Sequence, residues 1–248
     1  MIQSVKSALI KSKLWKAIKR ESLKRRKFLS QIGQDKWVLE RTNFRRGGYF
    51  IDIGAADGLY LSNTYALEKM YGWKGICVEP ANKIRDLRKN RRCIIENSCI
   101  YSKSGEFVDF QIDDEISGIK KYFDGAHKRK GNIMKIKTIT LKDLLKKYNS
   151  PKVIDYLSID TEGSEYEILK NFPFKDYEVK LVTIEHNAHS GKKEDLKKRE
   201  DIFKLLTKNG FIREPHDNFS RKYGATGIID FEDWYVHKSV KTRSKQII

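Results

Sequence analysis

Residues 49–64 read YFIDIGAADGLYLSNT, and this stretch decides how the rest of the sequence is interpreted. It opens with apolar residues of strand character around Asp52 and continues into a turn that contains Gly54, Asp57 and Gly58. Glycine has no Cβ, so a ligand can approach the backbone of such a turn closely. The two carboxylates beside that backbone favour a ligand that carries positive charge and no phosphate.

Segments of strand and helix character alternate along the chain. The strands are expected at residues 49–53, 75–78, 93–96, 107–112, 133–138, 153–159, 179–185, 211–213 and 234–236. The helices are expected at residues 61–70, from residue 80 onward, and at 140–148, 165–170 and 195–208. This alternation predicts a single α/β domain with a mainly parallel sheet and helices on both faces. Ligands of such sheets bind at the carboxyl ends of the strands.

Four of the expected strands end in acidic residues. Asp52 and Glu79 close the first two, and Asp160 and Glu185 close two later ones. The carboxyl ends of parallel strands meet at one edge of the sheet, so we expect these four carboxylates to converge on a common site.

The spacing of the first two strands limits which classes of ligand could bind. Glu79 follows Gly58 by 21 residues, about where an acid binds ribose in a nucleotide-binding βαβ unit. The dinucleotide fingerprint is broken, because Ala56 and Leu59 stand where it requires glycine and Asp57 would repel a pyrophosphate. The sequence also lacks the G-x-x-x-x-G-K-[ST] loop of ATP-binding proteins. S-adenosylmethionine, which has a ribose, a cationic sulfur and no phosphate, fits these residues.

Several segments, in the same order along the chain, resemble the FkbM-type methyltransferases. They are SQIGQDKWVL from residue 30, GYFIDIGAADGLYLSNTYALE from 48, GWKGICVEP from 72, TLKDLL from 140, DYLSIDTEGSEYEILKNFPF from 155 and TIEHN from 183. The resemblance implies a class I methyltransferase fold with a Rossmann-like sheet. It also implies methyl transfer from S-adenosylmethionine, commonly to a hydroxyl of a sugar or another small molecule.

The same resemblance assigns cofactor contacts by position. Asp52, Gly54 and Gly58 would line the methionine part, and Glu79 would hold the ribose hydroxyls. The remaining expected cofactor contacts are Ser98 and Cys99 beside the adenine, together with Asp57 and Asn63.

A hydroxyl is a weak nucleophile at neutral pH, so it needs a general base or a metal that lowers its pKa. Some class I O-methyltransferases hold a divalent cation at the ends of the two strands that here carry Asp160 and Glu185. By that resemblance these acids are candidate ligands of Mg²⁺ or Mn²⁺, with Asn187 or His186 as the third. Asp160 and His186 are the candidate catalytic residues, and without a metal His186 or His189 would be the base.

Other polar residues of this region have structural interpretations. Ser164 and Glu167 have the spacing of a capping box, and Glu162 and Glu165 are acids at an expected helix N-terminus. The other histidines are expected to be structural: His127, His216 and His237.

The net charge of +18 is concentrated at the ends of the chain. Residues 1–27 contain ten Lys or Arg and one acid, and residues 238–248 contain four basic residues and no acid. We therefore divide the chain into a basic extension (1–29), a methyltransferase domain (30–237) and a basic tail (238–248). Basic ends attract nucleic acid or an anionic membrane surface. An organellar presequence and a helical arm packed on its own domain are alternatives for the extension.

The remaining composition bears on location and on rival functions. Cys77, Cys93 and Cys99 have no C-x-x-C spacing and are expected to be reduced core thiols. No apolar run reaches the roughly 18 residues of a membrane span, and the N-terminus lacks a secretory signal. These features predict a cytoplasmic protein, with peripheral membrane attachment as an alternative. An RNA-directed methyltransferase and a non-catalytic nucleotide-binding module remain rivals to the enzyme with a small-molecule or glycan acceptor.

Overall fold

A computed structural model of the chain describes residues 22, 26–113, 116–122, 131–222 and 230–240. Most of the predicted basic extension and tail, as well as His127, lie outside these residues. Within the described ranges, no helix is both long enough and apolar enough to cross a bilayer. Cys77, Cys93 and Cys99 are free thiols, and Cys77 and Cys99 are buried.

The main sheet has seven strands in the order β10–β11–β9–β8–β1–β2–β3. Their bounds are β1 Tyr49–Ile53, β2 Lys74–Val78, β3 Ile94–Glu96, β8 Val153–Ile159, β9 Glu178–Glu185, β10 Phe211–Glu214 and β11 Glu232–His237. The central pairs are parallel, whereas β11 pairs antiparallel with both β9 and β10. The predicted, mainly parallel α/β sheet is therefore confirmed.

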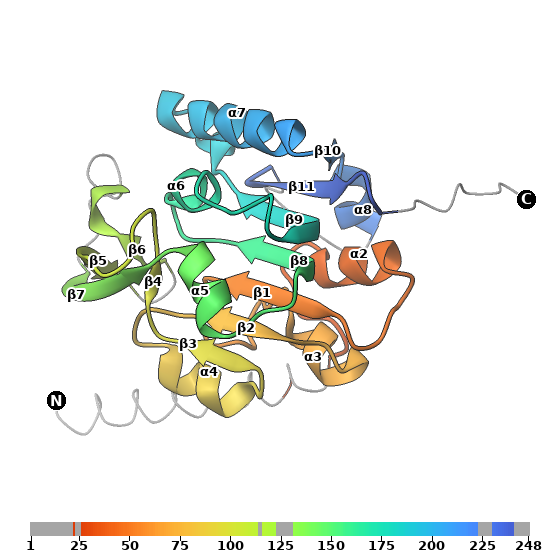
Figure 1. Cartoon of the computed structure of the whole chain (residues 1–248), viewed down its shortest axis with the longest axis horizontal. Helices are drawn as coiled ribbons and strands as arrows, with labels where there is room; N and C mark the ends of the chain where they lie inside the picture. Colours follow the sequence, from red (N-terminus) through yellow and green to blue (C-terminus); the bar gives the residue numbers. More distant parts are fainter. Residues whose placement is uncertain (1–21, 23–25, 114–115, 123–130, 223–229, 241–248) are drawn as a thin grey trace, which may run out of the picture.

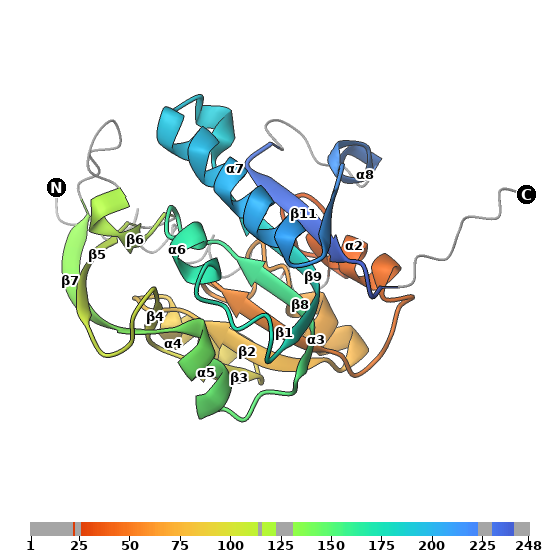
Figure 2. The ribbon, with the colours of Figure 1, turned by 45° about the horizontal axis from the view of Figure 1, so that its top comes forward.

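Helices cover both faces of this sheet (Figures 1 and 2). Apolar residues of α5 (Leu141–Lys147), α6 (Glu165–Leu169) and α7 (Lys193–Lys208) pack in one core with those of β1, β8 and β9. On the other face, α2 (Gln34–Arg41), α3 (Tyr65–Tyr71) and α4 (Ile84–Asn90) pack in a second core. The shorter helices are η1 Lys120–Tyr122, η2 Ala188–Ser190 and α8 Asp217–Lys222.

A second, four-stranded sheet lies beside the carboxyl ends of β1, β2 and β8 (Figures 1 and 2). Its strands, in the order β4–β7–β5–β6, are β4 Cys99–Ile100, β5 Phe107–Ile112, β6 Gly118–Ile119 and β7 Asn132–Ile139. The sequence predicted β5 and β7 as strands but not as a separate sheet. Their antiparallel pairing builds a small core of its own around Phe110, Ile119 and Ile136.

Two helices begin about four residues later than predicted. The helix expected from residue 61 starts at Tyr65, because Leu61 adopts a positive φ of 54° that ends any helical path before it. The helix expected from Pro80 starts at Ile84. By contrast, the helix expected at 140–148 begins where predicted, and Thr140 caps it, since its side chain accepts a hydrogen bond from the Asp143 amide.

Candidate functional site

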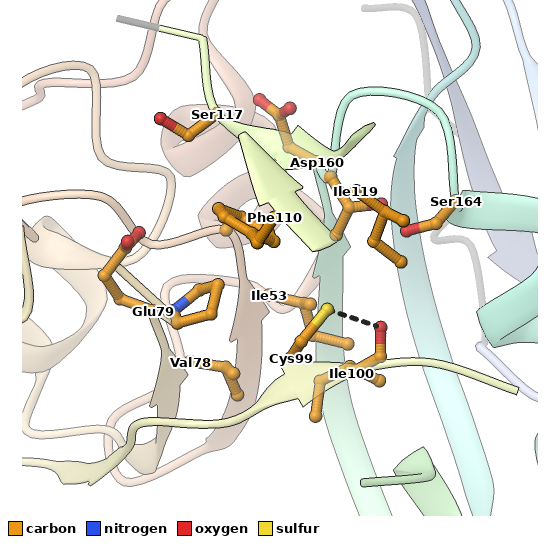
Figure 3. A pocket seen from close by; sticks show the side chains of 13 residues that line it. Ile53, Val78, Glu79, Cys99, Ile100, Phe110, Ser117, Ile119, Asp160 and Ser164 are labelled. Atoms are coloured by element: carbon orange, nitrogen blue, oxygen red, sulfur yellow. Dashed lines mark hydrogen bonds between the residues drawn. The ribbon is translucent and has the colours of Figure 1, made fainter. Parts of the chain in front are cut away.

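The carboxyl ends of β1, β2 and β8 open into a pocket with about 410 Å³ of empty space, part of it open to solvent. Its wall is made by Ile53, Gly54, Val78, Glu79, Pro80, Cys99, Ile100, Phe110, Ser117, Ile119, Asp160, Thr161 and Ser164. Figure 3 shows Glu79 on one side of this pocket and Ser164 on the other, with Cys99 and Ile100 between the strands below. Four predicted site residues thus meet here: Gly54, Glu79, Cys99 and Asp160.

Phe110, Ser117 and Ile119 were not predicted as site residues, although they line the pocket from the small sheet. Their sequence carries no motif that distinguishes them from other strand residues. Only the pairing of β5 with β6 brings them over the strand ends.

Glu79 is held by backbone amides at the pocket wall. It is buried, and its Oε1 accepts a hydrogen bond of 2.9 Å from the Ala81 N–H. Burial raises its pKa to about 7, against the stabilising effect of the Ala81 and Ala56 amides and of Lys83. The carboxyl group is therefore poised between its two protonation states near neutral pH.

The two glycines of the turn have different neighbours. Gly54 has a φ of +87°, lines the pocket and lies against the backbone of Asp160. Gly58 also has a positive φ, but a Cβ there would meet Leu87 and Arg91. Side chains of the protein itself therefore occupy the Cβ side of Gly58, and its predicted contact with the cofactor stays a prediction.

Asp52 and Asp57 do not line the pocket. Asp52 is buried beneath the turn, where its Oδ2 accepts a 2.6 Å hydrogen bond from the Thr64 hydroxyl. Burial raises the pKa of Asp52, with the Arg91 charge and the Thr64 hydrogen bond acting in the opposite direction. Asp57 caps its own turn, because its Oδ1 accepts hydrogen bonds from the N–H groups of Leu59 and Tyr60. Both carboxylates shape the turn in this structure, and their contact with a cofactor stays a prediction.

Asn63 and Ser98 are likewise engaged within the protein. Asn63 donates to the Ser158 hydroxyl at 3.1 Å, and Ser98 donates to the Glu96 carboxylate at 2.7 Å. Neither lines the pocket, so their predicted cofactor contacts are also untested.

Arg91 anchors the segment after the turn, and sequence reasoning missed it. Its side chain is buried, and its Nε lies 2.7 Å from the Glu68 carboxylate. Its Nη atoms donate to the hydroxyls of Ser62 and Thr64 and to the backbone oxygens of Gly58 and Thr64. One basic residue among many in a charged helix gives no sequence signal of burial.

An acidic cluster borders the pocket at the ends of β8 and β9. Asp160, Glu162 and Glu185 each place one carboxylate oxygen within 4.8 Å of the other two. Glu185 is buried, and its Oε2 has no hydrogen-bond partner. Its pKa is raised well above the ordinary value by burial and then by Asp160 and Glu162. The pKa of Asp160, whose side chain reaches solvent, is raised to about 6 by the surrounding protein and the neighbouring acids.

The third member of this cluster is Glu162, whereas the sequence proposed Asn187 or His186. Asn187 precedes η2 in a left-handed conformation with φ 56°. His186 is fully buried; its Nδ1 accepts the Ala188 N–H, and its Nε2 lies 3.6 Å from an Asp233 oxygen. This geometry corrects the expectation of a catalytic base, because neither nitrogen of His186 is open to an acceptor. His189, the other candidate base, lies in η2 and is exposed.

The predicted capping box at the start of α6 was wrong. The Ser164 hydroxyl donates to the Thr161 hydroxyl, and Glu167 forms an ion pair with Lys170. The side chain that organises this helix start is Glu165, which is fully buried and forms an ion pair with Lys198 of α7. The partner lies 33 residues away, so no local pattern reveals it.

A family profile matches most of the described domain. The sequence profile of the methyltransferase FkbM domain matches residues 52–213, more than half of the chain. Among solved structures, the O-methyltransferase from Bacillus cereus in complex with SAH is 10% identical with a TM-score of 0.48, over 92% of this chain and 90% of that chain. Precorrin-6y C5,15-methyltransferase from Geobacter metallireducens is 12% identical with a TM-score of 0.41, over 73% and 71%. The plantazolicin methyltransferase in complex with SAH is 10% identical with a TM-score of 0.41, over 85% and 83%. A search of curated proteins finds no significant match.

Proposed function

The chain belongs to the FkbM methyltransferase family, a family of S-adenosylmethionine-dependent enzymes with a class I methyltransferase fold; on that premise we propose that it methylates a hydroxyl oxygen of a sugar or glycan. The observation that supports the proposal is that Asp160 belongs both to the pocket and to the acidic cluster. This residue lines the pocket at the strand ends and also belongs to the acidic cluster with Glu162 and Glu185.

The pocket fits S-adenosylmethionine in its chemistry. Gly54 brings bare backbone to the wall, and Glu79 presents a buried carboxyl group on a neighbouring strand end. A ribose can donate two hydroxyl hydrogen bonds to such a carboxylate, and apolar walls at Phe110 and Ile119 suit a flat base. When bound, S-adenosylmethionine supplies a methyl group already activated by a cationic sulfur.

The acidic cluster fits a divalent cation. Three carboxylates within 4.8 Å are an oxygen-only donor set, which Mg²⁺ and Mn²⁺ prefer, and the buried Glu185 Oε2 lacks a partner. Asp160, Glu162 and Glu185 would hold the ion, which would lower the pKa of a hydroxyl beside it.

The chain's own residues supply the remaining work. Asp160, with a pKa of about 6, is ionised at neutral pH and can accept the hydroxyl proton at a carboxylate oxygen. Carboxylates also accept hydrogen bonds from several hydroxyls at once, as a saccharide offers. Asp160, ionised at neutral pH, would also repel a phosphate backbone that approached without a bridging cation, which favours a sugar over RNA.

A methyl-transfer assay tests the proposal. Purified protein is incubated with radiolabelled S-adenosylmethionine in separate reactions, each containing one acceptor class: monosaccharides, oligosaccharides or total RNA. We expect label in the saccharide fraction, a mass gain of one methyl group on oxygen, and loss of transfer in Asp160→Asn. Glu167→Gln serves as the matched control, since Glu167 lies on α6 outside the cluster. Transfer to RNA alone, or no saccharide-dependent turnover with any acceptor, would contradict the proposal.

A further inference from the structure

The turn that carries Glu162 has an unusual backbone. Glu162 and Gly163 follow one another with positive φ values of 59° and 130°. A residue with a Cβ is strained in the left-handed region, and this conformation persists only where the surroundings hold it. Some contact must therefore hold Glu162 in the conformation that places it beside Asp160 and Glu185.

That contact is made by Glu165. Its Oε1 accepts hydrogen bonds from the Thr161 N–H at 3.1 Å, the Thr161 hydroxyl at 3.0 Å and the Gly163 N–H at 2.8 Å. One carboxylate oxygen thus binds the backbone on both sides of Glu162.

The other oxygen of Glu165 binds a cation from a different helix. Lys198 of α7 places its Nζ 2.9 Å from Oε2, and Glu165 is fully buried while Lys198 is 11% exposed. Burial opposes the charged form of Glu165, but Lys198 and the Gly163 amide outweigh it and keep its pKa below the ordinary value. The second acid near Lys198 is Asp195, at 3.8 Å.

We propose that Glu165 and Lys198 are positioning residues, a buried ion pair that locks the Thr161–Gly163 turn and so presents Glu162 to Asp160 and Glu185. In this arrangement α7 contributes to the site through Lys198, although no residue of α7 lines the pocket. The turn also supplies the pocket residues Asp160, Thr161 and Ser164, so its conformation matters for the whole edge of the site. The part of the proposal that concerns a bound cation rests on the proposed function.

Amide hydrogen exchange, measured residue by residue by NMR on the full chain, tests the lock itself. In Lys198→Met we expect exchange at Thr161 and Gly163 to accelerate at least tenfold, while the β8 amide of Ser158 is unchanged. Lys198→Arg should restore rates to within threefold of wild type, because a guanidinium can also pair with Glu165. Lys197→Met is the matched control, since Lys197 is 75% exposed and pairs with Asp201 at the surface. The isosteric Glu165→Gln should behave like Lys198→Met.

Calorimetric titration with Mn²⁺ and with S-adenosylhomocysteine tests what the lock does for the site. We expect Lys198→Met to weaken Mn²⁺ binding at least tenfold and S-adenosylhomocysteine binding at most threefold, with Mn²⁺ affinity recovered in Lys198→Arg. If wild type binds no Mn²⁺, the cation part of the proposed function fails. The exchange rates then still test whether Glu165 and Lys198 hold the Thr161–Gly163 turn. Unchanged exchange at Thr161 and Gly163 in Lys198→Met overturns the proposal. So does equal acceleration at Ser158, which would mean that the pair stabilises the fold in general.

Discussion

The backbone carbonyl oxygen of Asp160 occupies the space that a side chain on Gly54 would need: a Cβ built on Gly54 would lie 1.7 Å from it. The two residues end neighbouring parallel strands, and the Asp160 N–H also donates to the Ile53 carbonyl at 3.0 Å. The glycine therefore serves the contact between two strand ends as well as the open pocket wall.

Gly54→Ala should accordingly separate these strand ends. Besides the left-handed strain of about 1–3 kcal/mol, the methyl group must displace backbone, so we expect a loss of stability above that range. For a domain of this size each kcal/mol lowers Tm by about 2–4 °C, which thermal unfolding resolves easily. Gly105→Ala is the control, because Gly105 has a similar φ of +84° with open space around it. Equal destabilisation by the two variants would refute the steric argument.

The raised pKa of Glu79 predicts a pH-dependent affinity for the cofactor. Its carboxyl group has a pKa of about 7 in the free protein, and ribose hydroxyls would donate to the ionised form. Below pH 7 binding must therefore displace a proton, so affinity should rise about tenfold between pH 6 and pH 8. Calorimetry with S-adenosylhomocysteine in buffers of different ionisation enthalpy would detect the released proton.

Glu79→Gln provides the control for that titration. The amide cannot ionise, so the affinity of the variant should be weaker and nearly flat over the same pH range. A wild-type profile that is also flat would show that Glu79 does not bind the ribose in its ionised form.

Removing Arg91 should destabilise the whole turn region. Arg91→Leu removes the buried guanidinium that pairs with Glu68 and leaves the carboxylate only Lys69 and the Arg92 N–H, and breaking a buried pair typically costs about 3–5 kcal/mol. Urea unfolding at pH 7 measures this loss, and Arg88→Leu, at an exposed position of α4 just before Arg91, should be nearly neutral. An equal effect of both substitutions would mean that the loss of any basic side chain here, and not of the buried pair, is responsible.

The ion pair between Glu68 and Arg91 also predicts how the free energy of unfolding depends on pH in acid. Arg91 and Lys69, acting against burial, lower the pKa of Glu68 from 4.5 to about 2 in the folded protein. Because Glu68 is partly screened by solvent, this shift corresponds to about 1–2 kcal/mol of stability that is present above pH 4.5 and is lost as the pH falls towards 2. Glu68→Gln should remove this part of the pH dependence, and an unchanged slope in that variant would argue against the pairing.

Thermal unfolding with and without Mn²⁺ tests the acidic cluster. Ligand binding to the folded state at 100 times Kd adds about 2.7 kcal/mol, so wild type should gain several degrees in Tm. Glu185→Gln should lose this gain, because the substitution removes one of the three carboxylates of the donor set. Glu167→Gln should keep the full gain in Tm. If Mn²⁺ does not change the Tm of the wild type, no cation binds at this site.

The strand ends of the main sheet could be predicted from the sequence, because a buried parallel strand is a continuous apolar run and the polar residue after it marks its end. Val153–Ile159 was predicted with its observed bounds, and Asp160 follows it at the pocket wall. The alternation of side chains along β1 could have predicted which face of the sheet Asp52 occupies. Alternate strand residues face opposite ways, so Asp52 shares the side of Phe50, which packs on α3 and α4.

Contacts between distant segments were beyond the reach of the sequence. Glu162 looked like an ordinary acid before a helix, and its place in the cluster depends on a left-handed turn held by Glu165 and Lys198. The small sheet posed the same difficulty, since β5 and β7 have strand character but nothing local decides which sheet they join.

The position of β11 has a consequence for synthesis on the ribosome. β11 follows β10 in the chain, but it lies between β10 and β9 in the sheet. A nascent chain that has emerged only through Glu214 therefore leaves one edge of β9 unpaired, and open apolar edges invite association with other chains. The family match ends at residue 213, before β11, the strand through which Phe211–Glu214 joins β9 in the sheet.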